Sequence, residues 1–406
     1  MGFGRPAGTS CLSTETLPAN SPERDDGCAT RLKIGLIAPP YFEIPPCSYG
    51  GVETVVAGLA DGLMAAGHAV TLLAAGSPGT AADYIPLWGE PIPERLGQPL
   101  PEITHAVKAR RAIEQLAERA GGCDLDVIHD HTLAGPINAA AYRELGVPVV
   151  ATVHNFIDAI LHDFYRELGD DLGLIAISDR QRHLSPDLNW VGRVHNAIDV
   201  SEWPFRESND GYALFLSRFS PDKGPHLALE AAHAAGVPLI LAGKCVEPIE
   251  VAAFRDSVLP ALGRADYVFG QADSTSKREL LAGARCLLLP LQWEEPFGMV
   301  MIEAMACGTP VVALNRGAAR EIIVDGVTGF VCENPADLSA AIARAQDLDP
   351  TACRRHVELN FNSTKMASGY EQIYRHAARV QSTQPNKFGT QPVQSIPGSL
   401  IPAISA

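Results

Sequence analysis

Short, wholly apolar runs alternate along the chain with longer segments in which apolar residues recur at helical spacing. Runs without polar alternation are typical of strands in a parallel sheet that helices cover on both faces. The first intervening helix is expected from Val52 to Ala66, where Gly67 ends it. In the first half of the chain, the pattern predicts strands at residues 32–38, 68–76, 126–129, 147–153 and 172–178.

The same alternation starts again in the second half, after Pro, Asp and Asn break it around residues 196–205 and indicate a hinge. The expected fold class is therefore α/β, with two doubly wound Rossmann-like domains facing each other across a cleft. Ligands of such sheets bind beyond the carboxyl ends of the strands, so the loops that follow strands are the places to search for chemistry. The second set of strands is expected at residues 212–217, 237–243, 266–270, 286–291 and 310–314.

The two ends of the chain lack this pattern. Residues 1–30 and 382–406 are rich in small polar residues and proline and show no periodicity, which predicts disordered tails. Between them, the sequence predicts a first domain over residues 31–196, a second over residues 197–364, and a helix over residues 365–381.

Composition narrows the class of protein. The 406 residues carry a formal net charge of −15, which argues against a general binder of nucleic acid or other polyanions. No apolar run reaches the roughly 18 residues that span a bilayer, and the first thirty residues contain no stretch typical of a secretory signal. Nine cysteines without a Cys-x-x-Cys pair favour reduced thiols over a zinc cluster or a disulfide framework. We therefore expect a cytoplasmic protein with no transmembrane segment.

An almost purely apolar helix is expected from about Gly298 to Cys307, and Glu303 is its only charge. Such a helix is mostly buried, and an unpaired carboxylate inside it costs on the order of several kcal/mol. Glu303 therefore needs polar partners, either a structural network or the hydroxyl groups of a ligand such as a ribose. Glu295 precedes the helix N-terminus, where free N–H groups and the helix dipole attract an anion. This segment predicts a sugar–phosphate site.

Two cations lie on the loop that follows the strand at residues 212–217. Arg218 and Lys223 are placed to clamp a diphosphate leaving group and to neutralise the charge that grows as it departs. The alternative interpretation is a solvated loop in which Asp222 forms a surface ion pair.

Paired glycines, Gly50 and Gly51, open the helix that follows the first strand. Glycine there lets the backbone approach a phosphate or a sugar closely, with the helix N-terminus aimed at it. The Gly-x-Gly-x-x-Gly pattern of a dinucleotide site is absent. A simple turn remains the alternative.

Histidines cluster where the strand at residues 126–129 ends. In a strand, His129 and His131 lie on the same side and Asp130 faces away. No third ligand follows at a metal-binding spacing, so the segment is interpreted as a cleft wall rather than a metal site. His195, beside the hinge, is expected to be structural.

Together these segments resemble the family 4 glycosyltransferases of the GT-B fold, over about residues 32–380. The resemblance rests on several ordered motifs, of which the most specific is the donor-site pattern Glu-x₇-Glu at Glu295 and Glu303. The others are Gly50–Gly51 with the following helix, residues 67–70, residues 196–199, the loop from Arg218 to Gly224, and residues 325–330. Three positions depart from the family pattern: Ala197 and Ser217 stand where Gly is usual, and Arg320 stands where Pro is frequent.

The resemblance implies a retaining glycosyltransferase that moves a hexosyl group from a nucleotide diphospho-sugar to an acceptor hydroxyl, with no metal or other cofactor. It implies that Glu303 binds the ribose and that Arg218 and Lys223 bind the diphosphate. Catalytic or sugar-contacting roles fall to Glu295 and to His154, which ends a predicted strand and should point into the cleft. The other donor-binding residues that it implies are Gly50, Gly51, Phe297, Gly298, Met299 and Val300. It also implies that the helix at residues 365–381 crosses back to the first domain.

Two other functions remain open at this point. One is a nucleotide-sugar epimerase of the same fold, and the other is a sugar-nucleotide-binding protein without catalytic activity. A UDP-sugar is favoured as donor because it is frequent in the family. The acceptor, whether a small molecule, a glycan or a lipid-linked group, is expected to meet loops at residues 40–50, 76–105 and 155–170. Weak membrane association is compatible with a lipid-linked acceptor.

Overall fold

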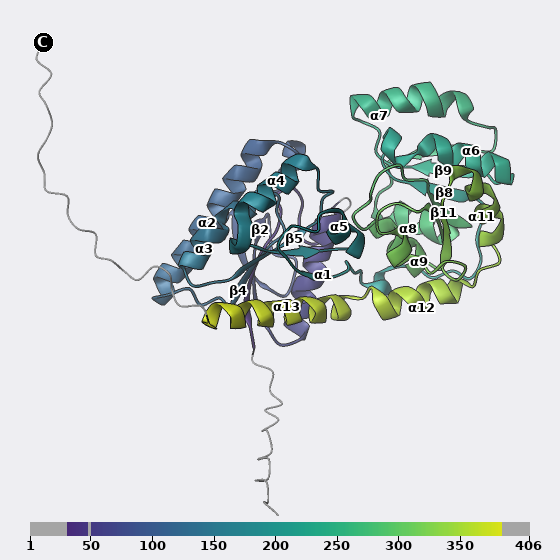
Figure 1. Cartoon of the computed structure of the whole chain (residues 1–406). Helices are drawn as coiled ribbons and strands as arrows, with labels where there is room; N and C mark the ends of the chain where they lie inside the picture. Colours follow the sequence, from purple (N-terminus) through teal and green to yellow (C-terminus); the bar gives the residue numbers. More distant parts are fainter. Residues whose placement is uncertain (1–30, 48–49, 384–406) are drawn as a thin grey trace, which may run out of the picture. The chain divides into compact units, whose positions relative to one another are not determined.

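The computed structural model describes residues 31–47 and 50–383, so the tail predicted at residues 1–30 lies outside the described residues. Residues 384–406 of the second predicted tail also lie outside them. Within the described residues, two parallel β-sheets form the centres of two α/β domains (Figure 1). The predicted fold class is thereby confirmed for both halves of the chain.

The first sheet consists of β1 (Lys33–Ile37), β2 (Ala69–Ala75), β3 (Asp83–Trp88), β4 (Val127–Asp130), β5 (Val149–Val153), β6 (Gly173–Ala176) and β7 (Trp190–Arg193). Its order is β3-β2-β1-β4-β5-β6-β7, and all its strand pairs are parallel. The order reverses between β1 and β4, so their carboxyl ends flank the crevice in which such sheets bind ligands.

The second sheet consists of β8 (Ala213–Leu216), β9 (Leu239–Ala242), β10 (Tyr267–Gly270), β11 (Cys286–Leu289), β12 (Val311–Leu314) and β13 (Gly329–Cys332). Its order is β10-β9-β8-β11-β12-β13, again with parallel pairs throughout. The order reverses between β8 and β11. The loops that carry Arg218, Lys223 and Glu295 leave these two strands at that reversal.

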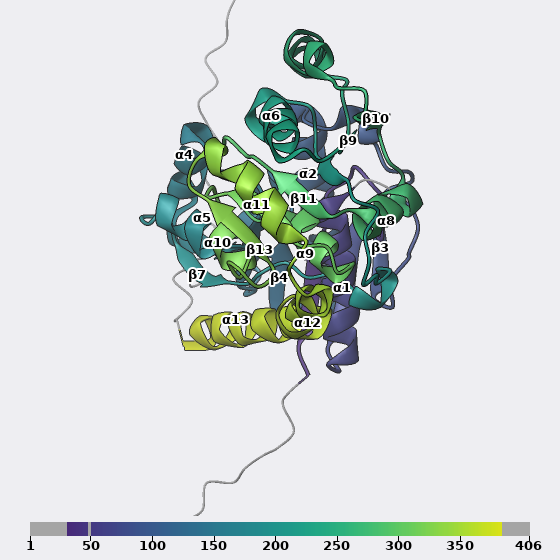
Figure 2. The ribbon, with the colours of Figure 1, turned by 90° about the vertical axis from the view of Figure 1, so that its right-hand side faces the viewer.

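Helices connect the strands in both domains. In the second domain, α11 packs on β11, β12 and β13 and beside α6 (Figure 2). The helices of the first domain are α1 (Gly51–Ala65), α2 (Pro99–Ala120), α3 (Ala139–Glu144), α4 (Ala159–Leu168) and α5 (Asp179–Leu184). Those of the second are α6 (Pro225–Ala235), α7 (Pro248–Ala253), α8 (Ser274–Gly283), α9 (Met299–Ala306), α10 (Ala319–Ile322), α11 (Leu338–Ala345) and α12 (Pro350–Asn360).

All ten predicted strands are confirmed, but β3, β7 and β13 were not predicted. Each of these three is an edge strand of its sheet. β3 contains Pro86 and is largely half-buried or exposed, and β7 alternates between half-buried and exposed residues. Edge strands tolerate proline and polar side chains because one side of the backbone needs no partner, and this masks the apolar pattern.

The last helix, α13 (Ser363–Thr383), packs against α1, β4 and β7 of the first domain (Figure 1). Its Tyr370 and Tyr374 are fully buried in the same apolar cluster as Leu36 and Val127 of the first sheet. The C-terminal end of the described chain thus completes the core of the N-terminal half.

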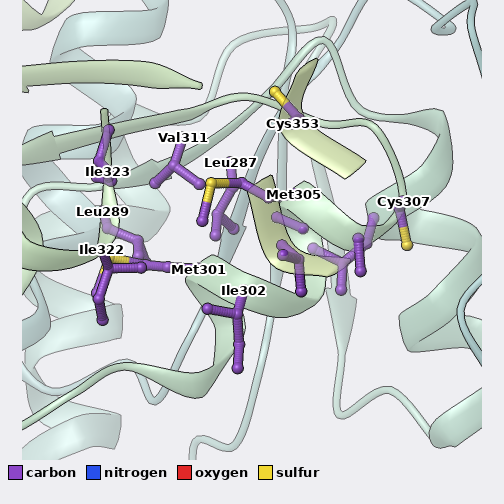
Figure 3. Packing of buried hydrophobic residues seen from close by; sticks show 14 of the residues in the cluster. Leu287, Leu289, Met301, Ile302, Met305, Cys307, Val311, Ile322, Ile323 and Cys353 are labelled. Carbon is purple, nitrogen blue, oxygen red and sulfur yellow. The ribbon is translucent and has the colours of Figure 1, made fainter. Parts of the chain in front are cut away.

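The predicted apolar helix is α9, and its burial is confirmed. Met301, Ile302 and Met305 are fully buried and lie against Leu287 of β11 and Val311 of β12 (Figure 3). Burial of each such side chain contributes about 1.5–3 kcal/mol, so the helix is held firmly on the sheet. Glu295, before this helix, and Glu303, within it, are therefore attached to a firmly held part of the backbone.

Candidate functional site

The loop after β8 is drawn against the loop after β11 by a close backbone contact. Gly224 adopts φ 73°, and a side chain built on it would bring its Cβ within 2.3 Å of the Pro290 carbonyl oxygen. Glycine is required there for both reasons, because a larger residue is strained at positive φ and has no space. The contact brings Lys223, the preceding residue, to the segment that carries Glu295.

Lys223 forms an ion pair with Glu295, with 2.6 Å between Nζ and Oε2. Its ammonium also lies 4.0 Å from the centre of the Trp293 ring, in the geometry of a cation–π contact. Only 10% of the Lys223 side chain is exposed, so little water competes for the pair. Lys223 therefore pairs with Glu295, whereas the solvated-loop alternative assigned an ion pair to Asp222.

Arg218 is more exposed than Lys223 and is steadied by a different carboxylate. Its Nη1 lies 3.4 Å from Oε1 of Glu250, a side chain with no exposed surface. The other carboxylate oxygen of Glu250 accepts hydrogen bonds from the backbone N–H groups of Val246 and Glu247 at the start of α7. Glu250 thus joins the loop after β9 to the cation on the loop after β8.

The backbone around Glu295 is clasped by the loop after β12. Ala318 donates a backbone hydrogen bond of 3.0 Å to the Glu295 carbonyl, and a Cβ on Gly317 would lie 2.0 Å from that oxygen. Phe297 is buried, and Gly298 takes φ 85° immediately before α9. Met299 and Val300, both half-buried, form the first turn, whose N–H groups have no partner within the helix.

Glu303 has a protein partner that the sequence did not reveal. Oε1 of Glu303 lies 2.6 Å from Nζ of Lys277, which comes from α8 and lies 5.4 Å from the ring centre of Trp203. Oε2 of Glu303 is buried and has no hydrogen-bond partner among the described residues. The buried carboxylate is thus half satisfied by the protein, and one oxygen remains available as an acceptor.

In the first domain, the paired glycines begin α1 as predicted. Gly50 takes φ 146°, and Gly51 is exposed with no atom near the position of a Cβ. Glu53, in the first turn, is 4% exposed, and its Oε2 lies 3.0 Å from where a Cβ on Gly50 would be. Burial raises the pKa of Glu53 to about 7. A carboxyl group with a pKa near neutrality therefore lies in the first turn of α1.

The histidines after β4 and β5 form a contact that spacing did not predict. Nδ1 of His131 lies 2.9 Å from Nε2 of His154. His129 lies on the same side of the strand as His131, with ring centres 3.9 Å apart, and Asp130 turns instead to Thr132. Within residues 31–47 and 50–383, no three His, Cys, Asp or Glu side chains gather in a way that would hold a metal ion.

Of the residues predicted from the sequence, Lys223 and Glu295 meet just before α9, and Glu303 lies within that helix. Arg218 pairs instead with Glu250, and the glycines and His154 lie in the first domain. Sequence reasoning missed Lys277, Glu250 and His131. Lys277 lies 26 residues before its partner, and Glu250 lies 32 residues after Arg218, so no local periodicity links either pair. His131 was noted for its neighbours in the chain, and its contact with the next strand was not foreseen.

Two family models match adjoining parts of the chain. The model described as Glycosyltransferase Family 4 matches residues 49–201, and the model described as glycosyl transferases group 1 matches residues 200–357. The paired sheets, the donor-side loops and these two matches agree with one another. The chain belongs to the group 1, family 4 glycosyltransferases of the GT-B fold.

Individual relatives agree with this assignment. The chain is 28% identical to the phosphatidyl-myo-inositol mannosyltransferase of Mycolicibacterium smegmatis, over 73% of this chain and 80% of that protein. It is 25% identical to AviGT4, a glycosyltransferase involved in avilamycin A biosynthesis, with a TM-score of 0.64 over 87% of this chain and 99% of that one. The Anabaena protein Alr3699/HepE, solved in complex with UDP-glucose, has the same fold, with 17% identity, a TM-score of 0.63, and 87% and 100% of the two chains covered.

Two further observations concern membrane-spanning helices and the cysteine thiols. Among residues 31–47 and 50–383, no helix has the length and apolar character needed to cross a membrane. The seven cysteines in this part of the chain are free, and four of them are buried, in keeping with the expectation of reduced thiols. Cys11 and Cys28 lie outside the described residues.

Proposed function

We propose that the protein is a retaining glycosyltransferase that transfers a hexosyl group from a nucleotide diphospho-sugar to an acceptor hydroxyl. The observation that carries the proposal is the presence of two lysine–carboxylate pairs, Lys223–Glu295 and Lys277–Glu303, on one Glu-x₇-Glu segment. Membership of the family supports the reaction class. The name of the M. smegmatis relative supports a hexosyl group, and the UDP-glucose bound to the Anabaena protein supports a UDP-sugar as donor.

Glu303 is assigned to the ribose of the donor. Its Oε1 is held by Lys277, so its direction is fixed before a ligand arrives. Its Oε2 lacks a partner and can accept a hydrogen bond from a ribose hydroxyl, which removes the cost of leaving a buried acceptor unsatisfied.

Lys223 and Arg218 are assigned to the diphosphate. An ammonium has three N–H donors, and the pair with Glu295 uses one of them, so Lys223 can hold a phosphate oxygen without leaving its carboxylate. Arg218 is exposed enough to turn toward the same group. The segment from Phe297 to Val300, which leads into α9, adds backbone N–H groups, and Gly50 and Gly51 offer a second helix start from the first domain.

The proposed chemistry is attack from the face that the leaving group occupies. The bond between the anomeric carbon and the phosphate oxygen breaks, and the acceptor oxygen bonds to the same face of an oxocarbenium-like sugar. The acceptor proton passes to the departing phosphate. Glu295 and His154 contact the sugar, and the two cations stabilise the negative charge that develops on the phosphate. The proposal needs no metal or other cofactor, because these side chains supply the positive charge.

The acceptor hydroxyl is proposed to reach the sugar along first-domain loops at residues 40–50, 76–105 and 155–170. A small molecule, a glycan and a lipid-linked acceptor all carry such a hydroxyl. The reaction is proposed to take place in the cytoplasm, with weak membrane association if the acceptor is lipid-linked.

A donor screen tests this proposal. The protein is incubated with UDP-, GDP- and ADP-sugars, with and without a chelator, and nucleotide release and sugar identity are followed. Slow release of one nucleotide, unchanged by the chelator, is expected. Lys223→Met and Glu303→Gln should abolish the release, whereas Lys365→Met, a matched change on the exposed side of α13, should not. Isomerised sugar without nucleotide release would identify an epimerase, and no turnover of any donor would indicate a binding protein.

The stereochemistry needs a separate measurement. Once an acceptor is found, the anomeric configuration of the product is compared with that of the donor by NMR. An inverted product would contradict the retaining mechanism while leaving the transferase assignment in place.

A further inference from the structure

The carboxyl ends of β4 and β5 carry two histidines in direct contact. His131 follows β4, His154 follows β5, and Nδ1 of the first lies 2.9 Å from Nε2 of the second. The ring centres lie 5.2 Å apart and the ring planes are inclined by only 26°, so the two nitrogens meet near the planes of both rings. When both rings are neutral, one of these two nitrogens carries a proton and donates the hydrogen bond, and the other accepts the hydrogen bond. The contact therefore makes one ring the donor and the other the acceptor.

The adjacent His129 takes no part in this choice because both its nitrogens are already bonded. Its Nδ1 lies 2.6 Å from the Tyr374 hydroxyl, and its Nε2 lies 2.7 Å from Oγ1 of Thr152. Oγ1 of Thr152 lies 3.0 Å from the Tyr370 hydroxyl. Both tyrosines come from α13, so the final helix holds the His129 ring, and that ring in turn packs on His131.

The surroundings of Nε2 of His131 determine which of the two histidines donates the hydrogen bond. His131 is 3% exposed, and its Nε2 is buried with no hydrogen-bond partner among the described residues. A proton on Nε2 would be a buried N–H without an acceptor, a rare and costly arrangement. A proton on Nδ1 leaves only an unused lone pair at Nε2 and gives the N–H a partner, namely Nε2 of His154.

We propose that His131 is a positioning residue that donates from Nδ1 to Nε2 of His154 and so fixes His154 with its own proton on Nδ1. This inference rests on the proposed function in one respect. If the protein binds a nucleotide sugar, Nδ1–H of His154 donates a hydrogen bond to an oxygen of the donor sugar. The inference rules out His154 as the base that takes the acceptor proton, since its only lone pair already accepts from His131. Proton removal is then left to the departing phosphate.

Burial keeps the pair neutral. It lowers the pKa of His154 to about 4 and that of His131 well below its usual value, and the neighbouring histidine rings lower the pKa of His131 further. The rings of His129, His154 and Tyr370 lie against His131, and the carboxylate of the adjacent Asp130 accepts hydrogen bonds from Thr132 instead.

The test reads the tautomer directly. ¹⁵N-histidine-labelled protein is studied by NMR near pH 7, and the resonances of His154 and His131 are assigned from their loss in His154→Asn and His131→Asn. The expected result is a protonated Nδ1 and a bare Nε2 on His154. A protonated Nε2 on His154 would overturn the proposal, whatever the activity of the protein.

Substitutions at His131 separate positioning from simple packing. The amide nitrogen of Asn stands about where Nδ1 of His stands, so His131→Asn should keep the His154 tautomer and keep kcat within about threefold. His131→Leu fills the space without a donor, frees Nε2 of His154 and should lower kcat by about 10²-fold, the usual effect of losing one oriented donor in a transition state. His376→Asn, on an exposed position of α13, is the control and should change neither readout.

The outcomes distinguish this inference from the proposed function. A wild-type protein with Nδ1 protonated on His154 and no turnover with any sugar nucleotide would sink the proposed function and leave the inference intact. Equal loss of kcat in the Asn and Leu variants would sink the inference and leave the transferase in place. If the Leu variant does not fold, the wild-type spectrum and the Asn variant still decide.

Discussion

The Lys277–Glu303 pair offers a sharp test of the energetics at the donor site. Lys277→Met removes the ammonium but keeps most of the aliphatic stem beside Trp203. The Glu303 side chain is 7% exposed and already has one oxygen without a partner, so the change leaves a buried carboxylate with no protein partner. Breaking a buried pair costs about 3–5 kcal/mol, and we expect about 2–3 kcal/mol because Lys277 is 29% exposed.

The magnitude is measured by urea unfolding of the wild type, Lys277→Met, Glu303→Gln and the double variant. Tryptophan fluorescence follows unfolding of both domains, since Trp88 and Trp190 lie in the first and Trp203 and Trp293 in the second. Glu303→Gln should cost about 1–2 kcal/mol, and the double variant should be more stable than the sum of the single losses predicts, by about 1.5–2 kcal/mol. Additivity within about 0.5 kcal/mol would refute the claim that the pair is energetically coupled.

The pH dependence of the stability of Lys277→Met is a second test of the buried charge on Glu303. Without the ammonium, the ionised Glu303 carboxylate is a buried charge with no protein partner, and protonation at low pH removes that charge. Protons therefore bind the folded variant more readily than its unfolded chain, which adds stability at low pH that is lost as the pH rises. The destabilisation should therefore shrink from pH 8 toward pH 5, and a loss that grows on acidification would contradict the assignment.

Three further outcomes follow from the site. Lys223→Met should raise the donor KM and lower nucleotide release by at least about 10²-fold, whereas Lys223→Arg, which keeps the charge, should recover part of it. Glu250→Gln weakens the hold on Arg218 and should weaken donor binding by about tenfold in calorimetry, whereas Glu230→Gln, at an exposed position of α6, should not. Because burial raises the pKa of Glu53 to about 7, its contribution to stability is present at pH 5 and lost as the pH rises through 7, so Glu53→Gln should flatten the melting temperature between pH 5.5 and 8 relative to the wild type.

The inner strands of both sheets were predictable from the sequence, whereas three of the four edge strands were not. Strands such as β1 and β5 are apolar along their length because helices cover both faces, and that pattern is legible in the sequence. β3 and β7 lie at the edges, where proline and exposed polar residues are tolerated, so their sequences resemble loops. β13 lies at an edge of the second sheet, and only its first two residues, Gly329 and Phe330, were noted as part of a motif.

The candidate site divides in the same way. The loop residues Arg218, Lys223 and Glu295 and the helix residue Glu303 could be placed from the motif and the topology. The partners of Arg218 and Glu303 could not, since the pairing of Glu303 with Lys277, for example, depends on how α8 packs beside α9. Burial did predict that Glu303 needs a polar partner, and the structure shows that the protein supplies half of what it needs.

The return of α13 means that the first half of the chain cannot be cut out as a working part. A fragment that stops at residue 196 would lack Tyr370 and Tyr374, and it would leave His129 and Thr152 with bare polar atoms beside an open apolar face. During synthesis, that half has to wait for almost the whole chain before its interior can close. A truncation that removes α13 therefore disrupts the core of the first domain, although the deleted residues follow the second domain in the chain.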